Sequence, residues 1–566
     1  MPRRAKLLAL ALGLATTSGL GIGHTAVGYV RDEGSYFEAA RSYASWTSLL
    51  VQSPVRALSE RARNEHFSPN HEHPALMKLA FGMSGRVFTR APDDAELPSE
   101  HANAGMVPLF VEGAAMRLPA QILAGVGVAT LFSLGHAMGG VLAGILCAGW
   151  FILLPHVWFH AGLACFDVPV AVATLLAAIA YRKSLGNRGW AIALGPIIGI
   201  AASIKHNAAF LPLVFAVHYT GCLVWSRARG GQRIRLGQMF PAPFVSMLVL
   251  ALPTFVLLWP WLWSDPAGRL WQYLQFHREH AYYNIEYLGR NYNLPPLPIS
   301  YPWVMTFATV PIALLVLALA GLVLRMRDDL REHVNGTHAG TFWAPLPNNA
   351  AKLDGLLWSL LAMFPIVLIS LPWIPIFGGT KHWLTAYPFF AIAAAHAFRR
   401  ITQCLALTGW LRFAPAAAVA LLLTPSAMAT RDSHPYGMSQ YGPLLGGPRG
   451  GTRLGLVRGF WGHAVLPLLD TLVEHSQPPR PIYLHDMHEL AHKQYVREGR
   501  WPQDTPPVPL QRARAALMFH ELHMTTYEVD VWNELGTTAP VAVLELDDVP
   551  LTSLYLVGHA NARAPE

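Results

Sequence analysis

The feature that most constrains this chain is a series of long apolar runs separated by short polar stretches. A helix crosses a membrane with roughly 20 mostly apolar residues. Eleven segments approach that length: 7–27, 118–135, 139–158, 163–181, 190–204, 208–225, 242–262, 302–324, 355–375, 382–398 and 411–429. Only 13% of the 566 residues are charged, against about 25% in soluble domains. We therefore predict a mainly α-helical, polytopic membrane protein with about eleven transmembrane helices.

The first apolar run allows two interpretations. Arg3, Arg4 and Lys6 precede its apolar centre, as in a cleaved signal peptide. A retained first helix, however, gives a consistent charge pattern over the many spans that follow. We favour the retained helix and leave cleavage open.

The basic residues of the short loops predict the orientation of the chain. With the N-terminus in the cytoplasm, most Lys and Arg residues of the short loops fall on the cytoplasmic side, as the positive-inside rule requires. Three regions then lie outside: 28–117, 263–301 and everything after 430. We expect a multi-pass protein of the cytoplasmic (inner) membrane. Because no basic stripe is interleaved with aromatic residues, we expect no nucleic-acid partner.

The outer regions differ in composition. Region 28–117 contains amphipathic stretches at 36–43 and 51–63, which predict helices lying along the membrane surface, and an acidic loop at 90–103. Region 263–301 is rich in Trp, Tyr and His, which suits the lipid headgroup layer.

The last region differs from the transmembrane domain, which we place at 1–430. Residues 431–566 carry more charge and no spanning run, so we predict a small soluble α/β domain outside the membrane. Strands are expected at 481–484 and 541–546, and a helix at 512–522. The four cysteines lie in or beside apolar runs, which predicts no disulfide framework and no thiolate metal site.

Two adjacent carboxylates, Asp32 and Glu33, follow the first span directly. They could cap the helix that follows, since acids favour a helix N-terminus. They could also supply a general base, because a partly desolvated carboxylate gains basicity.

Lys78 follows the segment His71-Glu72-His73-Pro74 on the same outer region. A lysine beside a membrane is often an interfacial anchor, but here it could hold a phosphate as a point charge. The two histidines could also bind a divalent metal with Glu72. Their spacing of two is not the i, i+4 spacing of a helical metal pair, so no metal ligand is assigned.

Asp167 lies at the outer end of an apolar run, where a carboxylate is a functional candidate by default. A helix N-cap is the alternative. Lys205, Lys381 and His382 fall on the same predicted membrane face, and such cations suit an anionic lipid headgroup.

In order and membrane placement, these motifs resemble the GT-C superfamily of membrane glycosyltransferases. The likeness is to its branch of protein O-mannosyltransferases and lipid A aminoarabinose transferases. It rests on Asp32-Glu33, on His73-Pro74-x-Leu76-x-Lys78, on Phe166-Asp167-Val168-Pro169 and on Lys381-His382-x-Leu384-x-x-Tyr387-Pro388. Further segments of the same style are Pro260-Trp261-Leu262-Trp263, Phe276-His277-x-x-His280, Ser300-Tyr301-Pro302, His434-Pro435-Tyr436-Gly437 and Phe460-Trp461-Gly462. The likeness covers roughly residues 1–465.

The resemblance implies a glycosyltransferase whose donor is a dolichyl- or undecaprenyl-phosphate sugar, with a protein or glycolipid acceptor. It assigns Asp32 as the base of an inverting displacement. Glu33 and Asp167 shape the site or bind the acceptor.

On the donor side, the resemblance implies that Lys78 holds the phosphate, assisted by Lys381 or His382. His73 and Lys205, which we predict on the same outer face, complete the expected phosphate-binding set. Family members often have Arg where this chain has Lys381-His382. The resemblance implies no certain cofactor.

Two other classes of function compete with this interpretation. A transporter or flippase of lipid-linked intermediates would show matched, broken halves, and the sequence has no such symmetry. A catalytically inactive scaffold would not need the polar set described above. For residues 431–566 we expect a role in recognising the acceptor.

Overall fold

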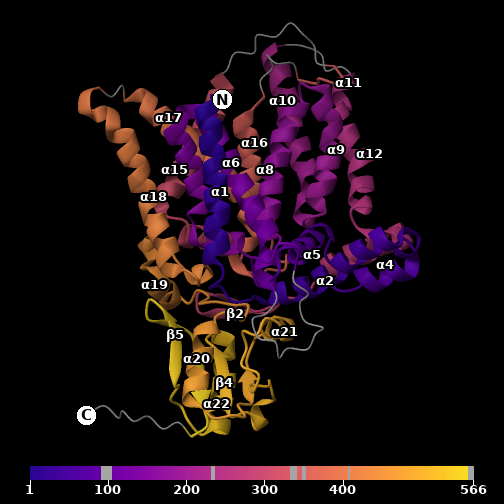
Figure 1. The fold of residues 1–566 in the computed structure, drawn as a ribbon. Coiled ribbons are helices and arrows are strands. Elements are labelled where there is room, and N and C mark those ends of the chain that lie inside the picture. Colours follow the sequence, from indigo (N-terminus) through magenta and orange to yellow (C-terminus); the bar gives the residue numbers. More distant parts are fainter. Residues whose placement is uncertain (91–104, 231–235, 332–340, 347–351, 406–407, 559–566) are drawn as a thin grey trace.

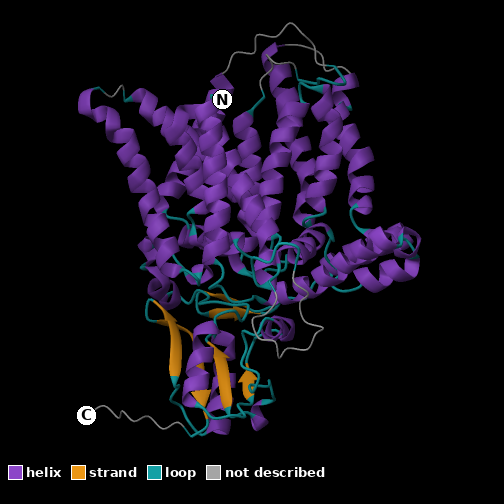
Figure 2. Ribbon diagram, viewed as in Figure 1, coloured by secondary structure: helices purple, strands orange, loops and turns teal. Residues whose placement is uncertain are grey.

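The computed structural model describes residues 1–566 except 91–104, 231–235, 332–340, 347–351, 406–407 and 559–566. A bundle of long helices forms most of the molecule, and a smaller α/β unit lies at one end of it (Figures 1 and 2). Between the two, several helices run crosswise to the bundle. The fold is mainly α-helical, as the sequence predicts.

Every predicted span corresponds to helical structure. The bundle helices are α1 (Arg3–Gly23), α6 (Glu112–Ile152), α8 (Asp167–Ser184), α9 (Arg188–Ala202), α10 (Leu211–Gly230), α12 (Ala242–Leu257), α14 (Tyr301–Thr309), α15 (Ile312–Arg331), α16 (Asp354–Ile369), α17 (Tyr387–Cys404) and α18 (Ala414–Ser433). Short helical pieces join them: α7 (Pro155–Ala161), α11 (Leu236–Met239) and the 3₁₀ helices η1 (His206–Phe210), η2 (Pro260–Ser264), η3 (Gly379–Ala386) and η4 (Gly409–Phe413).

Fewer of these helices are long and apolar enough to cross a membrane unaided. Within the described residues four pass that test: Arg3–Gly23, Glu112–Ile152, His206–Arg229 and Gly409–Ser433. The pair α14 and α15, bent by 118° at its break, makes a fifth if counted as one span. Helices α9, α12 and α16 are apolar but shorter. The chain is a multi-pass membrane protein, and the count of eleven spans stays a prediction.

Helix α6 contains a reversal at Gly139 and Gly140. Gly140 has φ 77° and ψ −167°, a backbone region that is essentially restricted to glycine. A Cβ on Gly144 would lie 2.9 Å from the ring of Phe132, so the two arms approach closely. The adjacent predicted segments 118–135 and 139–158 are therefore the arms of a helical hairpin, and the last residues of the second segment form α7 instead.

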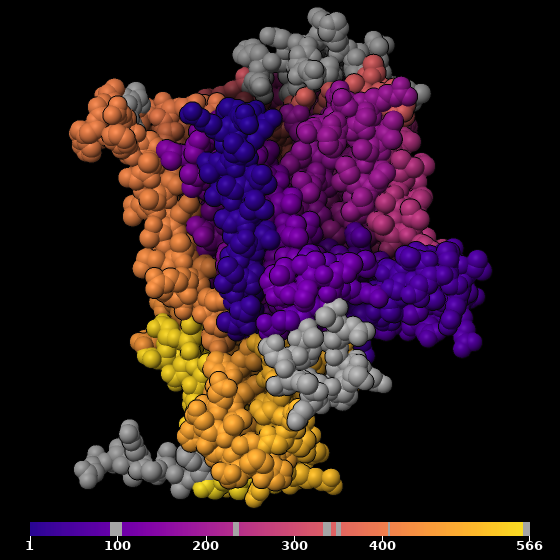
Figure 3. Space-filling view, in the orientation of Figure 1, coloured from indigo at the N-terminus to yellow at the C-terminus, as the bar shows by residue number. Residues whose placement is uncertain are grey.

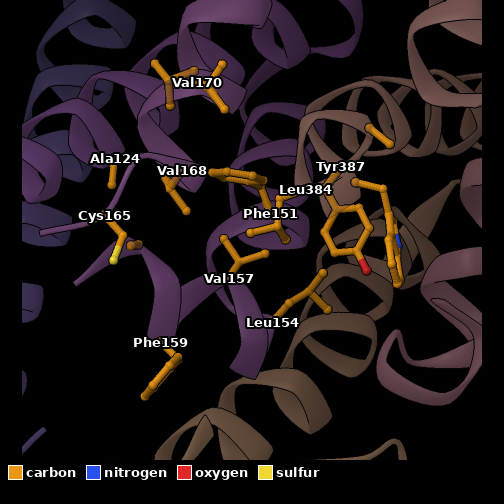
Figure 4. Close-up of a cluster of buried hydrophobic side chains, with 14 of the residues drawn as sticks. Ala124, Phe151, Leu154, Val157, Phe159, Cys165, Val168, Val170, Leu384 and Tyr387 are labelled. Carbon is orange, nitrogen blue, oxygen red and sulfur yellow. The ribbon is translucent and has the colours of Figure 1, made fainter. Parts of the chain in front are cut away.

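A buried apolar cluster packs α6, α7 and the start of α8 against η3 and the start of α17 (Figure 4). It joins Phe151 of α6, Val157 of α7, Val168 of α8, and Leu384 and Tyr387 around the start of α17, all of which are buried. Because these residues come from segments far apart in the chain, their contact holds the turn before α8 against η3.

The crosswise helices are α2 (Arg31–Gln52), α3 (Pro54–Ala57), α4 (Glu60–Phe67) and α5 (Leu76–Phe88). They lie across the end of the bundle and project beyond its side (Figures 1 and 3). The helices predicted at 36–43 and 51–63 are confirmed as helices. The loop predicted at 90–103 falls almost wholly outside the described residues. Region 263–301 forms α13 (Pro266–Arg278) and a hairpin of β1 (Ile285–Tyr287) and β2 (Arg290–Tyr292).

The C-terminal unit contains one four-stranded sheet with the order β3-β4-β6-β5. Its strands are β3 (Ile482–Leu484), β4 (Ala515–Phe519), β5 (Ala542–Leu546) and β6 (Val549–Leu556), and its helices are α19 (Gly447–Arg453), α20 (Leu466–His475), α21 (Glu489–Arg497) and α22 (Thr525–Leu535). Short 3₁₀ helices lie at Gly437–Ser439, Pro443–Leu445, Leu510–Arg512 and Leu522–Met524. Strands β3 and β4 are parallel and the other pairs are antiparallel.

Both strands predicted for this unit are confirmed, but the helix predicted at 512–522 is wrong. Residues Ala515–Phe519 form a fully buried strand that pairs with β3 on one side and β6 on the other. Ala, Leu and Met favour helices intrinsically. A short, continuous apolar run cannot be assigned from periodicity alone, and pairing on both edges overrides the local preference.

Candidate functional site

A cavity of about 570 Å³ lies where the bundle, the crosswise helices and the C-terminal unit meet. Its walls come from the start of α2, the loop before α5, η1, α13, η3 and two loops of the C-terminal unit. The polar residues that line it include Arg31, Asp32, Asn70, Glu72, His73, Lys205, His206, His277, His280, Glu286, Lys381, His382, Asp486, His488, Glu521 and His523. Five of the eight residues predicted from the sequence, namely Asp32, His73, Lys205, Lys381 and His382, therefore meet in one cavity.

Asp32 lies in the first turn of α2 and its side chain is 28% exposed to the cavity. The Lys381 ammonium donates a hydrogen bond to Asp32 Oδ2 at 3.2 Å, although the two residues are 349 positions apart. Lys381 Nζ also lies 4.0 Å from the ring centroid of Trp461, within reach of a cation–π interaction. Asp32 is thus a solvent-accessible carboxylate paired with a buried cation.

The backbone before Lys381 depends on glycine. Gly378 has φ 88°, and a Cβ there would lie 2.3 Å from Lys381 Cε. A side chain at this position would meet both backbone strain and a collision. Gly378 therefore lets the lysine stem fold back toward Asp32.

A second pair supports the same wall. Lys205, just before η1, donates a hydrogen bond to Asp167 Oδ1 at 2.7 Å. Asp167 is 4% exposed and opens α8, with Pro169 in its first turn. Lys205 faces the cavity, whereas Asp167 lies behind it, so Asp167 acts on the cavity through Lys205.

Histidines form the most crowded part of the wall. The rings of His206 and His277 lie 4.1 Å apart between centroids, and those of His73 and His277 lie 6.1 Å apart. Burial, together with Lys78 and the neighbouring histidines, holds the pKa of His73 well below its usual value. Burial, with His280 and Lys205 as lesser causes, lowers the pKa of His277 to about 4. Both imidazoles are therefore neutral at pH 7 in the unliganded protein.

His382 lies at the edge of this group. His382 Nε2 contacts both the backbone N–H and the carbonyl oxygen of Phe377. His382 also lines a small apolar groove that continues from the cavity between α8, α10 and α16, together with Phe210, Val214, Leu361 and Phe364.

Glu33, the neighbour of Asp32, does not reach the cavity. Its carboxylate accepts two hydrogen bonds from Arg117, at 2.7 and 2.6 Å, and one from the Ala164 N–H at 2.8 Å. Arg117 also donates to the carbonyls of Val27 and Gly28 at 2.9 and 3.0 Å. Both side chains are buried, so this pair ties the start of α2 to α6 and to the turn before α8.

Lys78 does not reach the cavity either. Its ammonium donates to the carbonyl and side-chain oxygens of Asn70 and, at 2.9 Å, to the carbonyl of His73. Burial lowers the pKa of Lys78 to about 7. Lys78 thus closes the loop that carries Asn70, Glu72 and His73, and positions them against the cavity.

The C-terminal unit, together with β1, supplies a wall that is rich in carboxyl groups. Asp486 pairs with Arg31, and the Leu522 N–H donates to Glu286 at 3.2 Å. Burial, then Asp486 and Glu286, raises the pKa of Glu521 well above its usual value. Burial also raises the pKa of Glu286.

Sequence reasoning assigned no role to His206, His277, Arg31, Asp486 and Glu521. His277 falls in the Phe276-His277-x-x-His280 motif, which was a usable signal. The residues of the C-terminal unit carry no such sequence signal, because only the fold brings them to the cavity. Among the described residues, no three His, Cys, Asp or Glu side chains are placed to hold a metal ion.

The fold and the cavity define a multi-pass membrane protein with a polar site at one end of its helix bundle. No protein-family model and no curated protein matches the chain. Solved structures that are similar in shape include two of ArnT from Cupriavidus metallidurans. One is bound to undecaprenyl phosphate, with 16% identity, 99% of each chain covered and a TM-score of 0.47. The other is in the apo state, with 15% identity, 97% of each chain covered and a TM-score of 0.46. Likeness at this level carries no argument about the reaction, so the function is argued below from the residues of this chain.

Proposed function

We propose that this protein is a glycosyltransferase that moves a sugar from a polyprenyl phosphate to an acceptor hydroxyl at the outer face of the cytoplasmic membrane. The observation that carries the proposal is the Asp32–Lys381 pair at 3.2 Å, partly exposed in a cavity at the end of an apolar helix bundle. It joins a potential base to a potential phosphate ligand where a lipid-linked substrate could present its headgroup.

Asp32 is the base in this proposal. It takes the proton of the acceptor hydroxyl as the hydroxyl oxygen attacks the anomeric carbon and the bond from that carbon to the phosphate oxygen breaks. The Lys381 ammonium holds the Asp32 carboxylate in the free protein by the 3.2 Å hydrogen bond, and the donor phosphate competes for that ammonium when it binds. Attack opposite the leaving phosphate inverts the configuration of the sugar.

Lys381, Lys205, His73 and His382 are the proposed phosphate ligands, because all four line the cavity. Cations fixed in a partly dehydrated site stabilise the charge that develops on a leaving phosphate. The apolar groove lined by Phe210, Val214 and Leu361 is suited to the first part of the polyprenyl chain. A surrounding membrane would hold the rest.

Four residues have supporting roles in this proposal. Asp167 orients Lys205, Lys78 closes the loop that carries His73, and Glu33 with Arg117 fixes the first turn of α2, on which Asp32 lies. The C-terminal unit recognises the acceptor, which is a protein or a glycolipid. This assignment follows from the wall that the unit adds to the cavity.

The test uses the purified full-length protein in detergent with a panel of polyprenyl-phosphate sugars, and follows donor loss and polyprenyl phosphate release. We expect one donor to be consumed by the wild type, and Asp32→Asn to lower the rate by a factor of about 10² to 10⁴, the usual effect of removing a general base. Glu38→Gln, an exposed change on the same helix, should leave the rate unchanged.

If no donor of the panel is consumed, even with membrane extract as the source of acceptor, the proposal is contradicted. Lipid-flipping assays would then test the transporter alternative. Full activity of Asp32→Asn would remove Asp32 as the base.

A further inference from the structure

The charged groups on the bundle side of the cavity leave no spare positive charge for a phosphate. Lys381 pairs with Asp32 at 3.2 Å and Lys205 with Asp167 at 2.7 Å. On the crosswise helices, Lys78 is buried and interacts electrostatically with Glu72. On the opposite wall, Arg31 is engaged by Asp486. An incoming phosphodiester therefore adds a negative charge that these pairs do not offset.

The histidines on this wall lack such partners. His206 opens η1, His277 lies on α13 and His73 lies in the loop before α5, and their rings meet with centroids 4.1 and 6.1 Å apart. The buried Nε2 atom of His277 has no hydrogen-bond partner. The rings of Tyr36 and Phe166 pack on His73, with centroids 5.9 and 6.0 Å away. His280, itself stacked on Phe377, and His382 are the further imidazoles that interact electrostatically with His206.

We propose that His206 and His277, together with His73, form the subsite for the donor phosphodiester and take up a proton when it binds. The proposal rests on the proposed function and names the part of the site that supplies the missing positive charge. It assigns a ligand-binding role to His206 and His277, neither of which the sequence motifs identified as a phosphate ligand.

The physical reason is a change in environment on binding. In the free protein burial and the cations around the cluster keep the rings of His73 and His277 uncharged. Of the acids nearby, Asp32 and Asp167 are already paired with lysines, and Glu72 accepts a hydrogen bond from the Asn70 amide at 2.7 Å. A phosphodiester oxygen beside the cluster offers both an opposite charge and a hydrogen-bond acceptor, and both favour the imidazolium form.

The same imidazolium is useful during transfer. Breaking the bond between the anomeric carbon and the phosphate oxygen leaves its electron pair on that oxygen, so the charge on the phosphate changes from −1 to −2. The new bond joins the acceptor oxygen to the anomeric carbon, and the acceptor proton goes to Asp32. The protonated cluster stays hydrogen-bonded to the phosphate and stabilises the added charge.

Calorimetric binding tests the proposal with a polyprenyl methyl phosphodiester, whose charge is fixed between pH 6 and 8, on the full-length protein in lipid nanodiscs. Repeating the titration in buffers of different ionisation enthalpy gives the number of protons taken up. A group that is neutral when free and protonated when bound makes affinity rise as pH falls, by about tenfold per pH unit for one proton. We expect that slope for the wild type and a net proton uptake near one.

The variants are His277→Gln and His206→Gln, which keep a polar side chain but cannot hold a proton at these pH values. We expect each to reduce proton uptake by at least half and to flatten the pH dependence of the dissociation constant. His475→Gln, an exposed change on α20, is the matched control and should behave as the wild type. Proton uptake is compared only among variants whose thermal unfolding midpoint equals that of the wild type. Because the two histidines are replaced separately, either variant alone can test the proposal.

The outcomes separate this inference from the function on which it rests. Phosphodiester binding without proton uptake, or with uptake unchanged in both variants, overturns the inference and leaves the glycosyltransferase proposal standing. Binding of no polyprenyl phosphodiester at any pH overturns both.

Discussion

Asp32 and Glu33 are adjacent in the chain, yet their side chains have opposite surroundings. Asp32 faces the cavity beside one cation, whereas Glu33 is 0% exposed and accepts four hydrogen bonds, two from the Arg117 guanidinium and one each from the N–H groups of Ala164 and Val30. A carboxylate held in this way is fully occupied, so it has no lone pair free for an acceptor hydroxyl. Its contribution is to the geometry of the turn that presents Asp32.

We predict that Glu33→Gln destabilises the protein by about 3–5 kcal/mol, because breaking a buried ion pair leaves the Arg117 charge uncompensated. Thermal unfolding in detergent, followed by tryptophan fluorescence, measures the loss. Asp32→Asn should leave the unfolding midpoint near that of the wild type, and exposed Glu38→Gln is the control for a lost carboxylate on α2. An unchanged midpoint with abolished donor consumption would give Glu33 a catalytic role instead.

At the scale of single residues, the sequence predicts which polar residues belong to the site region, but not which of them line the cavity and which support the surrounding structure. The acid pair after the first span, the loop lysine and the cations before η1 and in η3 are visible as charges at the ends of apolar runs. Arg117, which removes Glu33 from the cavity, is 84 positions away from it in the chain. Likewise, Lys78 donates hydrogen bonds to loop carbonyls and does not face the cavity. A lysine that closes a loop and a lysine that binds a ligand look the same in the sequence, and only the fold distinguishes them.

At the scale of elements, one close contact joins α2 to α21 and so joins the crosswise helices to the C-terminal unit. A Cβ on Gly34 would lie 2.5 Å from the Ala491 backbone nitrogen. Nearby, Arg41 donates to Gln494 at 2.7 Å and Glu112 accepts from Arg497 at 2.6 Å. Because α2 also carries Asp32, the position of the C-terminal wall and that of the proposed base depend on the same helix.

We predict that Gly34→Ala separates the two helices at a cost of about 1–3 kcal/mol, the usual penalty of overpacking. Limited proteolysis should then cut the C-terminal unit faster, and donor consumption should fall with it. Gly21→Ala on α1 is the matched control, since its nearest neighbour would be 3.6 Å away, an ordinary contact. Unchanged proteolysis of Gly34→Ala would show that this contact does not hold the unit in place.

The sequence predicts most of these elements because apolar runs and amphipathic stretches report burial directly. Prediction from the sequence fails where a segment is buried by elements that are distant in the chain. The run at 515–519 reads as helical until strands β3 and β6 pair with its edges. The separation of α14 from α15 by a 118° bend is equally invisible in an apolar stretch.

At the scale of the whole molecule, the cavity has two unlike walls. One wall offers Lys205, Lys381 and the histidines His73, His206 and His277, whereas the other offers Asp486 and Glu521 of the C-terminal unit and Glu286 of β1. In the proposed reaction the anionic donor binds at the wall of lysines and histidines, and the acceptor contacts the wall of carboxyl groups. Donor affinity and acceptor affinity should therefore depend on different residues, and the two affinities can be measured separately.

Glu521 provides the test of that division. Burial and the neighbouring acids Asp486 and Glu286 raise its pKa well above the usual value, and Arg31 opposes this only as the least of the causes. The protonated carboxyl group can donate a hydrogen bond to an acceptor oxygen, and that bond is lost as pH rises through the raised pKa. Glu521→Gln keeps a donor at every pH, whereas Glu521→Met has none.

We predict that Glu521→Met raises the KM for the acceptor about tenfold, equivalent to roughly 1.4 kcal/mol, a typical hydrogen-bond contribution. The affinity for a polyprenyl phosphodiester should not change. Glu521→Gln should keep the wild-type acceptor KM at low pH and remove its rise at high pH. Glu545→Gln, an exposed change on β5, is the control. If Glu521→Gln were as damaging as Glu521→Met, the carboxylate would act in its charged form; if either variant weakened donor binding instead, the two walls would not divide the substrates in this way.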